Sequence, residues 1–288
     1  MTEVIKTKRD GAVFEVELDR PKANAIDLKT SREMGEVFKE FRDDPELRVA
    51  IVSTAGEKFF CAGWDLKAAA DGDAVDGDYG VGGFGGLQEL RGLNKPVIAA
   101  VNGMAVGGGF ELALSCDMIY CSDHSSFALP EIKAGTLADA ATVKLPKRIP
   151  HHVAMEMLFT GRWMDAQEAL HHGLVNAVMP QDDLMDHVRS IARDLAAGPP
   201  LVFAAIKEVV REAENQTFQD MMNRITKRKL STVDILYDSD DNLEGAKAFA
   251  EKRDPVWKGP HHRTDHQPRS LRSRGYRNAG RFNPAGRQ

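Results

Sequence analysis

Two glutamates stand in settings that suit acid–base chemistry. Glu111 follows three consecutive glycines in GMAVGGGFELALSCDMIY (103–120) and opens an apolar segment. Glu131 follows a proline in SSFALPEIKAGTLAD (125–139). Burial raises the pKa of a carboxyl group, so that it can hold or release a proton near neutral pH. An isolated glutamate is usually a surface residue or a cap, but this pair predicts two carboxyls that share acid–base work.

The glycines before Glu111 predict exposed backbone N–H groups. At the first turn of a helix such groups have no partner within the helix and favour an anion or a developing oxyanion. No Lys-Ser or Lys-Thr follows, so the segment is not a phosphate-binding P-loop. Ala62 and Gly63, in EKFFCAGWDLKAAA (57–70), mark a second strand-to-helix junction. Two junctions could each give one N–H to the same oxygen, but tight packing of a helix on a strand would explain the glycines equally well.

The elements that position these residues alternate between strand and helix. Val13, Phe14, Val16 and Leu18 indicate a strand that ends before Pro21, and the spacing of Met34, Val37, Phe38 and Phe41 indicates an amphipathic helix. Short Val- and Ile-rich runs are typical of strands buried on both faces; they are LRVAIVST (47–54), KPVIAAVNG (95–103) and DMIYCSD (117–123), with helical stretches at FELALSC (110–116) and AQEALHHG (166–173) between or after them. This alternation predicts an α/β fold with a parallel sheet.

The chain divides into three parts by composition. Residues 1–195 form the mixed core, and residues 196–258 carry only helical patterns. Residues 259–288 form an Arg-rich tail with no helical or strand period, for which we expect disorder. Beyond Gly259 there are seven Arg and one Asp, so the net charge of −5 divides into +6 there and −11 in the body. An acidic body is a poor nucleic-acid binder.

Bulk composition indicates a soluble, cytoplasmic protein. Of the 288 residues, 42% are hydrophobic and 28% are charged. No apolar run approaches the roughly 20 residues that span a bilayer, and the amino terminus lacks the apolar core of a signal peptide. The three cysteines are odd in number and form no CxxC pair, so we expect neither disulfides nor a metal site.

An acidic, glycine-rich segment at 71–86, DGDAVDGDYGVGGFGG, has two interpretations. It is either a solvated, flexible connector or a mobile flap over an active site.

Several motifs, taken in order, resemble the crotonase (enoyl-CoA hydratase/isomerase) family over about residues 4–259. They are DRPKANAI, GEKFFCAGWDLK, KPVIAAVNGMAVGGGFELALSCD, FALPEIKAG, TGRWMDAQEALHHGLVNAV and AFAEKRDPVWKG. Within the family, the runs DRPKANAID, EMGEVF, FRDDP, LRVAIV and GWDLKAAA are similar to one dehydratase almost letter for letter. The resemblance implies a spiral of ββα units, a C-terminal helical module that joins subunits into trimers or hexamers, and an acyl-CoA thioester as substrate.

The resemblance also implies roles for individual residues. The backbone N–H groups of Ala62 and Gly108 would form the oxyanion hole for the thioester carbonyl. Glu111 and Glu131 match the two glutamates of members that add or remove water, which favours hydratase or dehydratase chemistry over isomerase or hydrolase chemistry. No metal or redox cofactor is implied, because coenzyme A enters as part of the substrate.

Other matched positions concern the substrate's two ends. Those expected to bind CoA are Lys22, Phe60 and Leu66 (the last two through the backbone around them), Phe249, and Lys252, which could reach a neighbouring subunit. The expected acyl-pocket residues are Trp64, Tyr79 and Phe84; Trp64 and Tyr79 would suit a quaternary ammonium group, although packing explains Trp64 as well.

One departure from the family and two alternatives stay open. The family usually carries a glycine pair after Glu131, where this chain has Ala140 and Ala141, and the added methyl groups should stiffen the backbone and narrow the pocket. The first alternative is a general short-chain enoyl-CoA hydratase of fatty-acid breakdown. The second is an RNA-binding role, for which the Arg-rich tail is the only support.

Overall fold

The computed structural model describes residues 4–72, 74 and 77–259. Its larger sheet has six strands in the order β1-β2-β3-β5-β7-β10. Strand β1 pairs with β2 antiparallel, and the remaining neighbours are parallel. The strands are β1 (Ile5–Asp10), β2 (Val13–Leu18), β3 (Val49–Thr54), β5 (Val97–Val101), β7 (Met118–Ser122) and β10 (Ala177–Met179).

A smaller sheet has four strands, three of which follow strands of the larger sheet directly in the chain. Its order is β4-β6-β8-β9, and β4, β6 and β8 run parallel. These strands are β4 (Phe59–Cys61), β6 (Met104–Val106), β8 (Ser126–Ala128) and β9 (Trp163–Asp165). Each turn of the chain therefore gives one strand to each sheet and then a helix: β3-β4-α2, β5-β6-α3 and β7-β8-α4. The helices are α2 (Leu66–Ala70), α3 (Gly108–Leu114) and α4 (Glu131–Ala134). This repeat confirms the predicted α/β spiral of ββα units.

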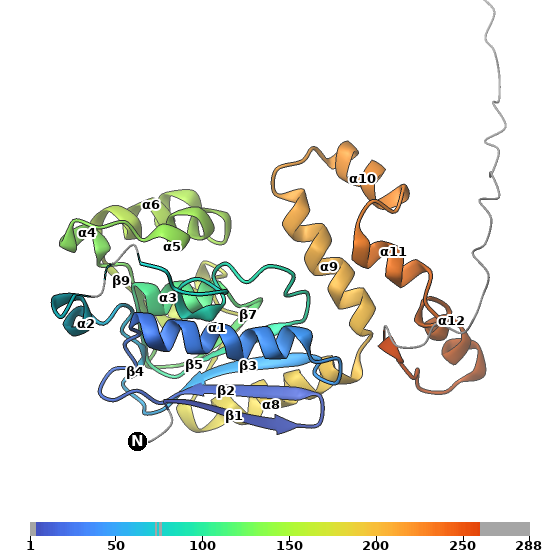
Figure 1. The fold of residues 1–288 in the computed structure, drawn as a ribbon, viewed down its shortest axis with the longest axis horizontal. Helices are drawn as coiled ribbons and strands as arrows, with labels where there is room; N and C mark the ends of the chain where they lie inside the picture. The colour runs from blue at the N-terminus through green and yellow to red at the C-terminus, as the bar shows by residue number, and fades with distance from the viewer. Residues whose placement is uncertain (1–3, 73, 75–76, 260–288) are drawn as a thin grey trace, which may run out of the picture.

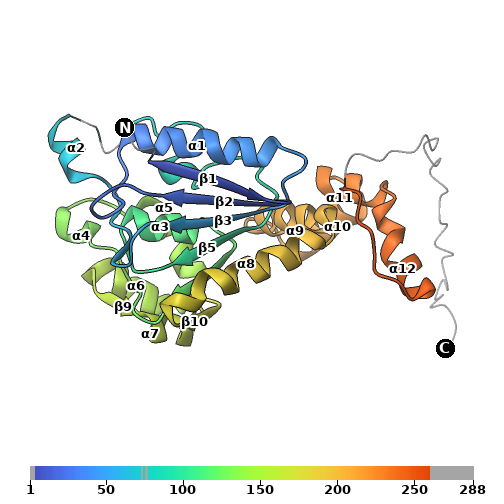
Figure 2. The same ribbon diagram turned by 90° about the horizontal axis from the view of Figure 1, so that it is seen from below.

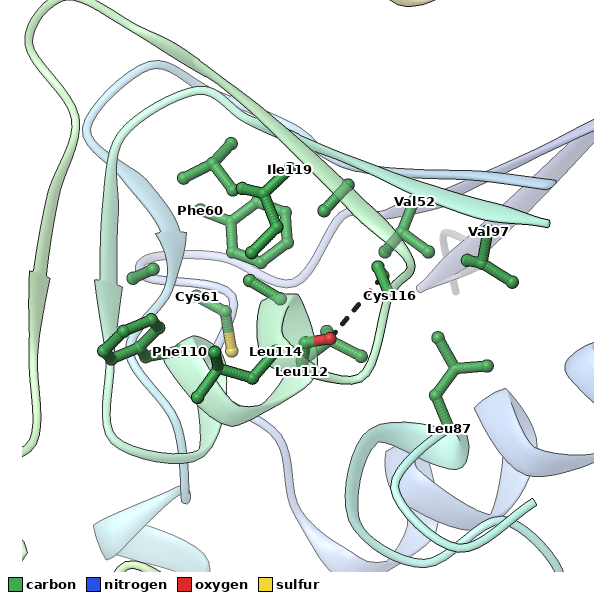
Figure 3. Packing of buried hydrophobic residues seen from close by; sticks show 14 of the residues in the cluster. Val52, Phe60, Cys61, Leu87, Val97, Phe110, Leu112, Leu114, Cys116 and Ile119 are labelled. Atoms are coloured by element: carbon green, nitrogen blue, oxygen red, sulfur yellow. Dashed lines mark hydrogen bonds between the residues drawn. The ribbon is translucent and has the colours of Figure 1, made fainter. Parts of the chain in front are cut away.

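Helices cover both faces of the larger sheet. Helix α1 (Leu28–Asp43) lies on one face and α8 (Gln181–Ala197) on the other (Figures 1 and 2). Met34, Phe38 and Phe41 of α1 are fully buried, as their spacing predicts. All residues of β3 and β5 are buried, which confirms the prediction of two-sided burial. Figure 3 shows the core between α3 and the sheet, where the ring of Phe60 lies among aliphatic side chains.

Helices α5 (Asp139–Lys144) and α6 (His151–Thr160) lie above α3 in Figure 1. Helix α7 (Ala166–His171) lies near β9 and β10 in Figure 2. Two short 3-10 turns are η1 (Phe84–Gly86) and η2 (Leu145–Lys147). The cysteines Cys61, Cys116 and Cys121 are all buried and form no disulfide.

The C-terminal segment is built of helices up to Glu251 and has no strand in its described residues. It holds α9 (Pro200–Ala213), α10 (Phe218–Thr226), α11 (Ser231–Tyr237) and α12 (Asp241–Glu251), which stand apart from the two sheets (Figures 1 and 2). A small core of Ala205, Met221, Leu230 and Val233 joins α9, α10 and α11. The expected division at residue 195 falls within α8, which packs on the larger sheet, so the core continues to Ala197. The predicted disorder of the tail concerns residues 260–288, which lie outside the described residues.

Among the described helices, none combines the length and the apolar character that crossing a bilayer requires.

Candidate active site

The smaller sheet brings the predicted catalytic segments to one edge. Strand β6 lies between β4 and β8, and all three are parallel, so their carboxyl ends meet at the same side. The turn at 62–65 follows β4, the glycines at 107–109 follow β6, and Glu131 comes shortly after β8. Segments far apart in sequence are therefore neighbours because of the ββα repeat.

Each of the three glycines has a different close neighbour. Gly107 has φ +54°, and a Cβ there would lie 2.5 Å from Glu131 Oε1. A Cβ on Gly108 would overlap the ring of Phe84, and one on Gly109 would overlap the carbonyl oxygen of Cys61. Close packing, one of the two explanations for GGG, therefore applies at Gly108 and Gly109, and Gly107 lies against the carboxyl of Glu131.

Replacing Gly109 with alanine is therefore expected to loosen the site. The new methyl group would meet the backbone of β4, which cannot move aside like a flexible side chain, and overpacking typically costs about 1–3 kcal/mol. Urea unfolding should show this loss together with lower turnover. Gly245→Ala in α12 is the matched control, because its methyl group would lie 3.4 Å from Trp257, an ordinary contact. Equal stability of the two variants would contradict the explanation.

The predicted oxyanion hole needs one correction. The N–H of Ala62 donates to Ala23 O at 3.0 Å, so it is already used inside the protein. The N–H of Asp65 likewise donates to Ile26 O. Between them, the backbone N–H of Trp64 has no hydrogen-bond partner in the described part of the chain. Trp64, not Ala62, is the donor that this turn can offer to a ligand.

Gly108 supplies the second free donor. Its N–H begins α3 and has no partner among the described residues. A Cβ built on Gly63 would lie 2.9 Å from Gly108 N, which shows how closely the two turns approach. The free N–H groups of Trp64 and Gly108 therefore belong to adjoining turns, as an oxyanion hole requires. The sequence does contain a sign of this donor. Asp65 is a typical helix N-cap residue and caps α2, so the residue before it, Trp64, lies outside that helix and its N–H is not used there.

Glu111 is buried and fixed on both oxygens. Its Oε1 accepts from the N–H of Ala141 at 2.8 Å, and its Oε2 accepts from Gln88 Nε2 at 3.2 Å. Only 7% of its surface is exposed. Burial raises the pKa of Glu111, and the two hydrogen bonds and the charge of Lys144 partly oppose this rise. Ala141, one of the two alanines in place of glycine, thus holds this carboxylate through its backbone.

Glu131 is partly buried and less restrained. Its Oε2 is shielded from solvent and has no partner in the described residues, so it is left for a ligand. Burial raises the pKa of Glu131 to about 7, its own backbone N–H opposes this rise, and the charges of Glu111 and Asp139 add to it. A carboxyl with this pKa can both take and give a proton at neutral pH.

Five of the other predicted binding residues lie on segments next to the two glutamates and the free N–H groups. Trp64, Tyr79 and Phe84 pack on one another beside Gly108. Lys22 and Leu66, both exposed, lie on segments joined by the bridge between Ile26 and Trp64.

The side chains of three residues that were predicted to bind CoA do not lie at this site. The ring of Phe60 is fully buried in the core, so only backbone near it remains for a nucleotide. Phe249 and Lys252 lie at α12, at the opposite end of the molecule from α2 in both views (Figures 1 and 2). Within one chain, α12 does not meet the site.

Comparison with known proteins decides the family. Residues 8–260 match the sequence profile of the enoyl-CoA hydratase/isomerase family. The chain belongs to this family.

Relatives and solved structures agree with this membership. A carnitinyl-CoA dehydratase of Citrobacter koseri is 56% identical over 260 residues, which are 90% of this chain and all of that protein. A carnitinyl-CoA dehydratase of Escherichia coli K12 is 55% identical with the same coverage. The crystal structure of an enoyl-CoA hydratase from Mycobacterium tuberculosis H37Rv has a TM-score of 0.81 at 35% identity, covering 89% of this chain and 99% of that one. The predicted resemblance to the crotonase family is confirmed.

Proposed function

We propose that this chain removes or adds water across the α,β bond of a CoA thioester, and that it is a carnitinyl-CoA dehydratase. The reaction would convert L-carnitinyl-CoA to crotonobetainyl-CoA and water. The observation that carries the proposal is that two carboxyls, those of buried Glu111 and partly buried Glu131, lie at the same edge of the smaller sheet as the free N–H groups of Trp64 and Gly108. Identity of 55–56% to carnitinyl-CoA dehydratases over their full length supports this substrate.

The chemistry follows from where charge develops. Removing a proton next to a thioester carbonyl puts negative charge on its oxygen, and two fixed N–H donors stabilise that charge. Glu131 takes the α proton, and Glu111 gives a proton to the departing hydroxyl. In the reverse direction Glu111 activates water and Glu131 protonates the α carbon. Both protons move between carboxyls and substrate, so this scheme needs no cofactor besides the coenzyme A of the substrate.

Binding of CoA would involve two copies of the chain. Lys22 and the backbone near Leu66 would contact the nucleotide in one subunit. Phe249, which is 87% exposed, and Lys252 would reach it from a neighbour, because they lie far from the site of their own chain. Helices α9–α12 would then be an oligomerisation module in a trimer or a hexamer.

The test is a spectrophotometric assay of the thioester-conjugated double bond. Crotonobetainyl-CoA and crotonyl-CoA are compared as hydration substrates. We expect a higher kcat/KM for crotonobetainyl-CoA. A preference for crotonyl-CoA would indicate a general short-chain enoyl-CoA hydratase instead, and no turnover of either would refute hydro-lyase activity.

The pair of carboxyls also predicts the pH dependence. Dehydration needs ionised Glu131 and protonated Glu111, and hydration needs the reverse, so both directions use the pair with one proton. Because the pKa of Glu131 is about 7, the pair loses this proton above that pH. We expect kcat/KM to fall about tenfold per pH unit above pH 7 in both directions. A kcat/KM that stays constant up to pH 9 would show that the proton is not shared in this way.

A further inference from the structure

The rings of Trp64, Tyr79 and Phe84 form a continuous aromatic wall beside the free N–H groups. The ring centroids of Trp64 and Tyr79 are 5.5 Å apart with planes at 83°, and those of Tyr79 and Phe84 are 5.5 Å apart at 77°. Trp64 and Phe84 lie 6.4 Å apart. Phe84 lies against Gly108, and Trp64 itself carries one of the two free donors. If the N–H groups of Trp64 and Gly108 hold the thioester oxygen, the acyl group attached to that thioester lies next to this wall.

The spacing shows that the wall is not an enclosing cage. Centroids at these distances are those of rings in direct contact, which leaves no room for a ligand between them. Trp64 and Tyr79 are partly exposed, whereas only 7% of Phe84 is exposed. A ligand would therefore lie over the outer faces of Trp64 and Tyr79, and Phe84 would support them from behind.

The segment that carries Tyr79 and Phe84 is anchored on α1. Ser31 Oγ donates to Gly83 O at 3.0 Å and accepts from Gly85 N at 3.1 Å. Arg32 Nε donates to Asp78 O at 2.8 Å. The described residues from 77 to 86 are thus held in place by α1, so the wall exists before a ligand arrives. A preorganised surface loses little conformational entropy on binding.

The charge beside the two glutamates favours a cation, because Asp139 precedes by two residues Ala141, whose N–H is bonded to Glu111. Asp139, exposed in the first turn of α5, has no hydrogen bond or ion pair with the described residues, and its charge acts on both Glu111 and Glu131. The nearest cation on the same helix, Lys144, donates to Ser115 Oγ at 2.9 Å.

We propose that the outer faces of Trp64 and Tyr79 form a subsite for a permanently cationic acyl end, and that the charge of Asp139 favours this cation from a distance. This inference rests on the proposed function, since L-carnitinyl and crotonobetainyl groups end in a trimethylammonium. A quaternary ammonium has no hydrogen to donate, so an aromatic face and an uncompensated carboxylate are the groups that recognise it. The subsite selects charge, not only size.

The test compares two acyl-CoA substrates of the same shape. One is crotonobetainyl-CoA, and the other is 5,5-dimethylhex-2-enoyl-CoA, in which carbon replaces the nitrogen of the trimethylammonium. The measured quantity is the ratio of their kcat/KM values for hydration, charged over neutral. We expect a ratio well above ten in the unchanged protein. Two desolvated cation–π contacts would account for about this factor.

Variants then assign the ratio to residues. Trp64→Leu keeps the backbone N–H and should lower the ratio roughly tenfold or more. Tyr79→Leu should act in the same direction, and Tyr79→Phe should preserve the ratio because the ring remains. Asp139→Asn should lower the ratio by about threefold at low ionic strength and less at high salt, because an exposed charge is screened. Asp182→Asn, an exposed acid in the first turn of α8 across the sheet, is the matched control and should leave the ratio unchanged.

The outcomes separate the two proposals. Turnover of both substrates with a ratio near one would overturn the subsite but leave the dehydratase proposal standing. Loss of both activities by the same factor in Trp64→Leu and Tyr79→Leu would also overturn it, because the wall would then serve only as packing. No turnover of either substrate by the unchanged protein would overturn both proposals.

Discussion

Replacing Glu131 with glutamine should lower kcat for both hydration and dehydration by about 10²–10⁴-fold. The amide has nearly the same shape as the carboxyl but can neither take nor give the α proton, and positioned general acids and bases contribute factors of this size. The fold should persist, because Oε2 of Glu131 has no partner among the described residues that the substitution could break. Steady-state kinetics with crotonobetainyl-CoA, alongside thermal unfolding, provides the measurement.

The matched control for this variant is Glu168→Gln. Glu168 is also a glutamate in the first turn of a helix, but it pairs with Arg162 away from the site. Its replacement should leave kcat unchanged. If Glu131→Gln retained the turnover of the unchanged protein, another group would have to move the α proton.

Replacing Glu111 with glutamine should lower kcat by a similar factor, but for a different reason. The amide can still accept the N–H of Ala141 through its oxygen, so the helix and the loop should keep their places. What is lost is the proton for the departing hydroxyl, or the base that activates water. We expect kcat to fall about 10²–10⁴-fold in both directions.

Binding distinguishes this loss from damage to the site. The affinity of the Glu111→Gln variant for crotonobetainyl-CoA, measured by calorimetry, should stay close to that of the unchanged protein. Full activity of this variant would remove Glu111 from the mechanism. A collapse of binding together with activity would indicate a structural role instead.

Much of the core followed from local patterns in the sequence. The buried strands β3, β5 and β7 and the helix α1 were predicted from apolar periodicity, because two-sided burial and the 3.6-residue repeat leave clear marks. Which strand pairs with which is not a local property, so the division into two sheets came from the family resemblance. The pairing of Glu111 with Glu131 was suggested by the residues around each of them, and their catalytic roles stay a prediction.

The misplaced oxyanion donor shows where such reasoning fails. Ala62 follows β4 directly and looked free in sequence, but residues 23–26 lie beside the turn and accept its N–H. That segment has no strand pattern of its own, so its pairing with the turn could not be predicted from local sequence. The free donor is therefore Trp64, two residues after the predicted Ala62.

The glycine-rich segment at 71–86 illustrates a second limit. Glycines were interpreted as a source of flexibility, either in a connector or in a flap. In the described residues, Gly82 and Gly86 pack backbone against backbone, and Gly86 lies against α1 where a side chain would not fit. Glycine composition alone does not distinguish a mobile loop from one held by close contact. Residues 73, 75 and 76 of this segment lie outside the described residues.

Exchange of the α protons of butyryl-CoA in deuterium oxide tests the central claim most directly. This saturated thioester has no β leaving group, so exchange needs only the two N–H donors and the base. We predict that the unchanged protein and Glu111→Gln both incorporate deuterium at the α carbon, while Glu131→Gln is at least about a hundredfold slower. Exchange by Glu131→Gln at the unchanged rate, or no exchange by the unchanged protein, would contradict the convergence of these groups on one thioester.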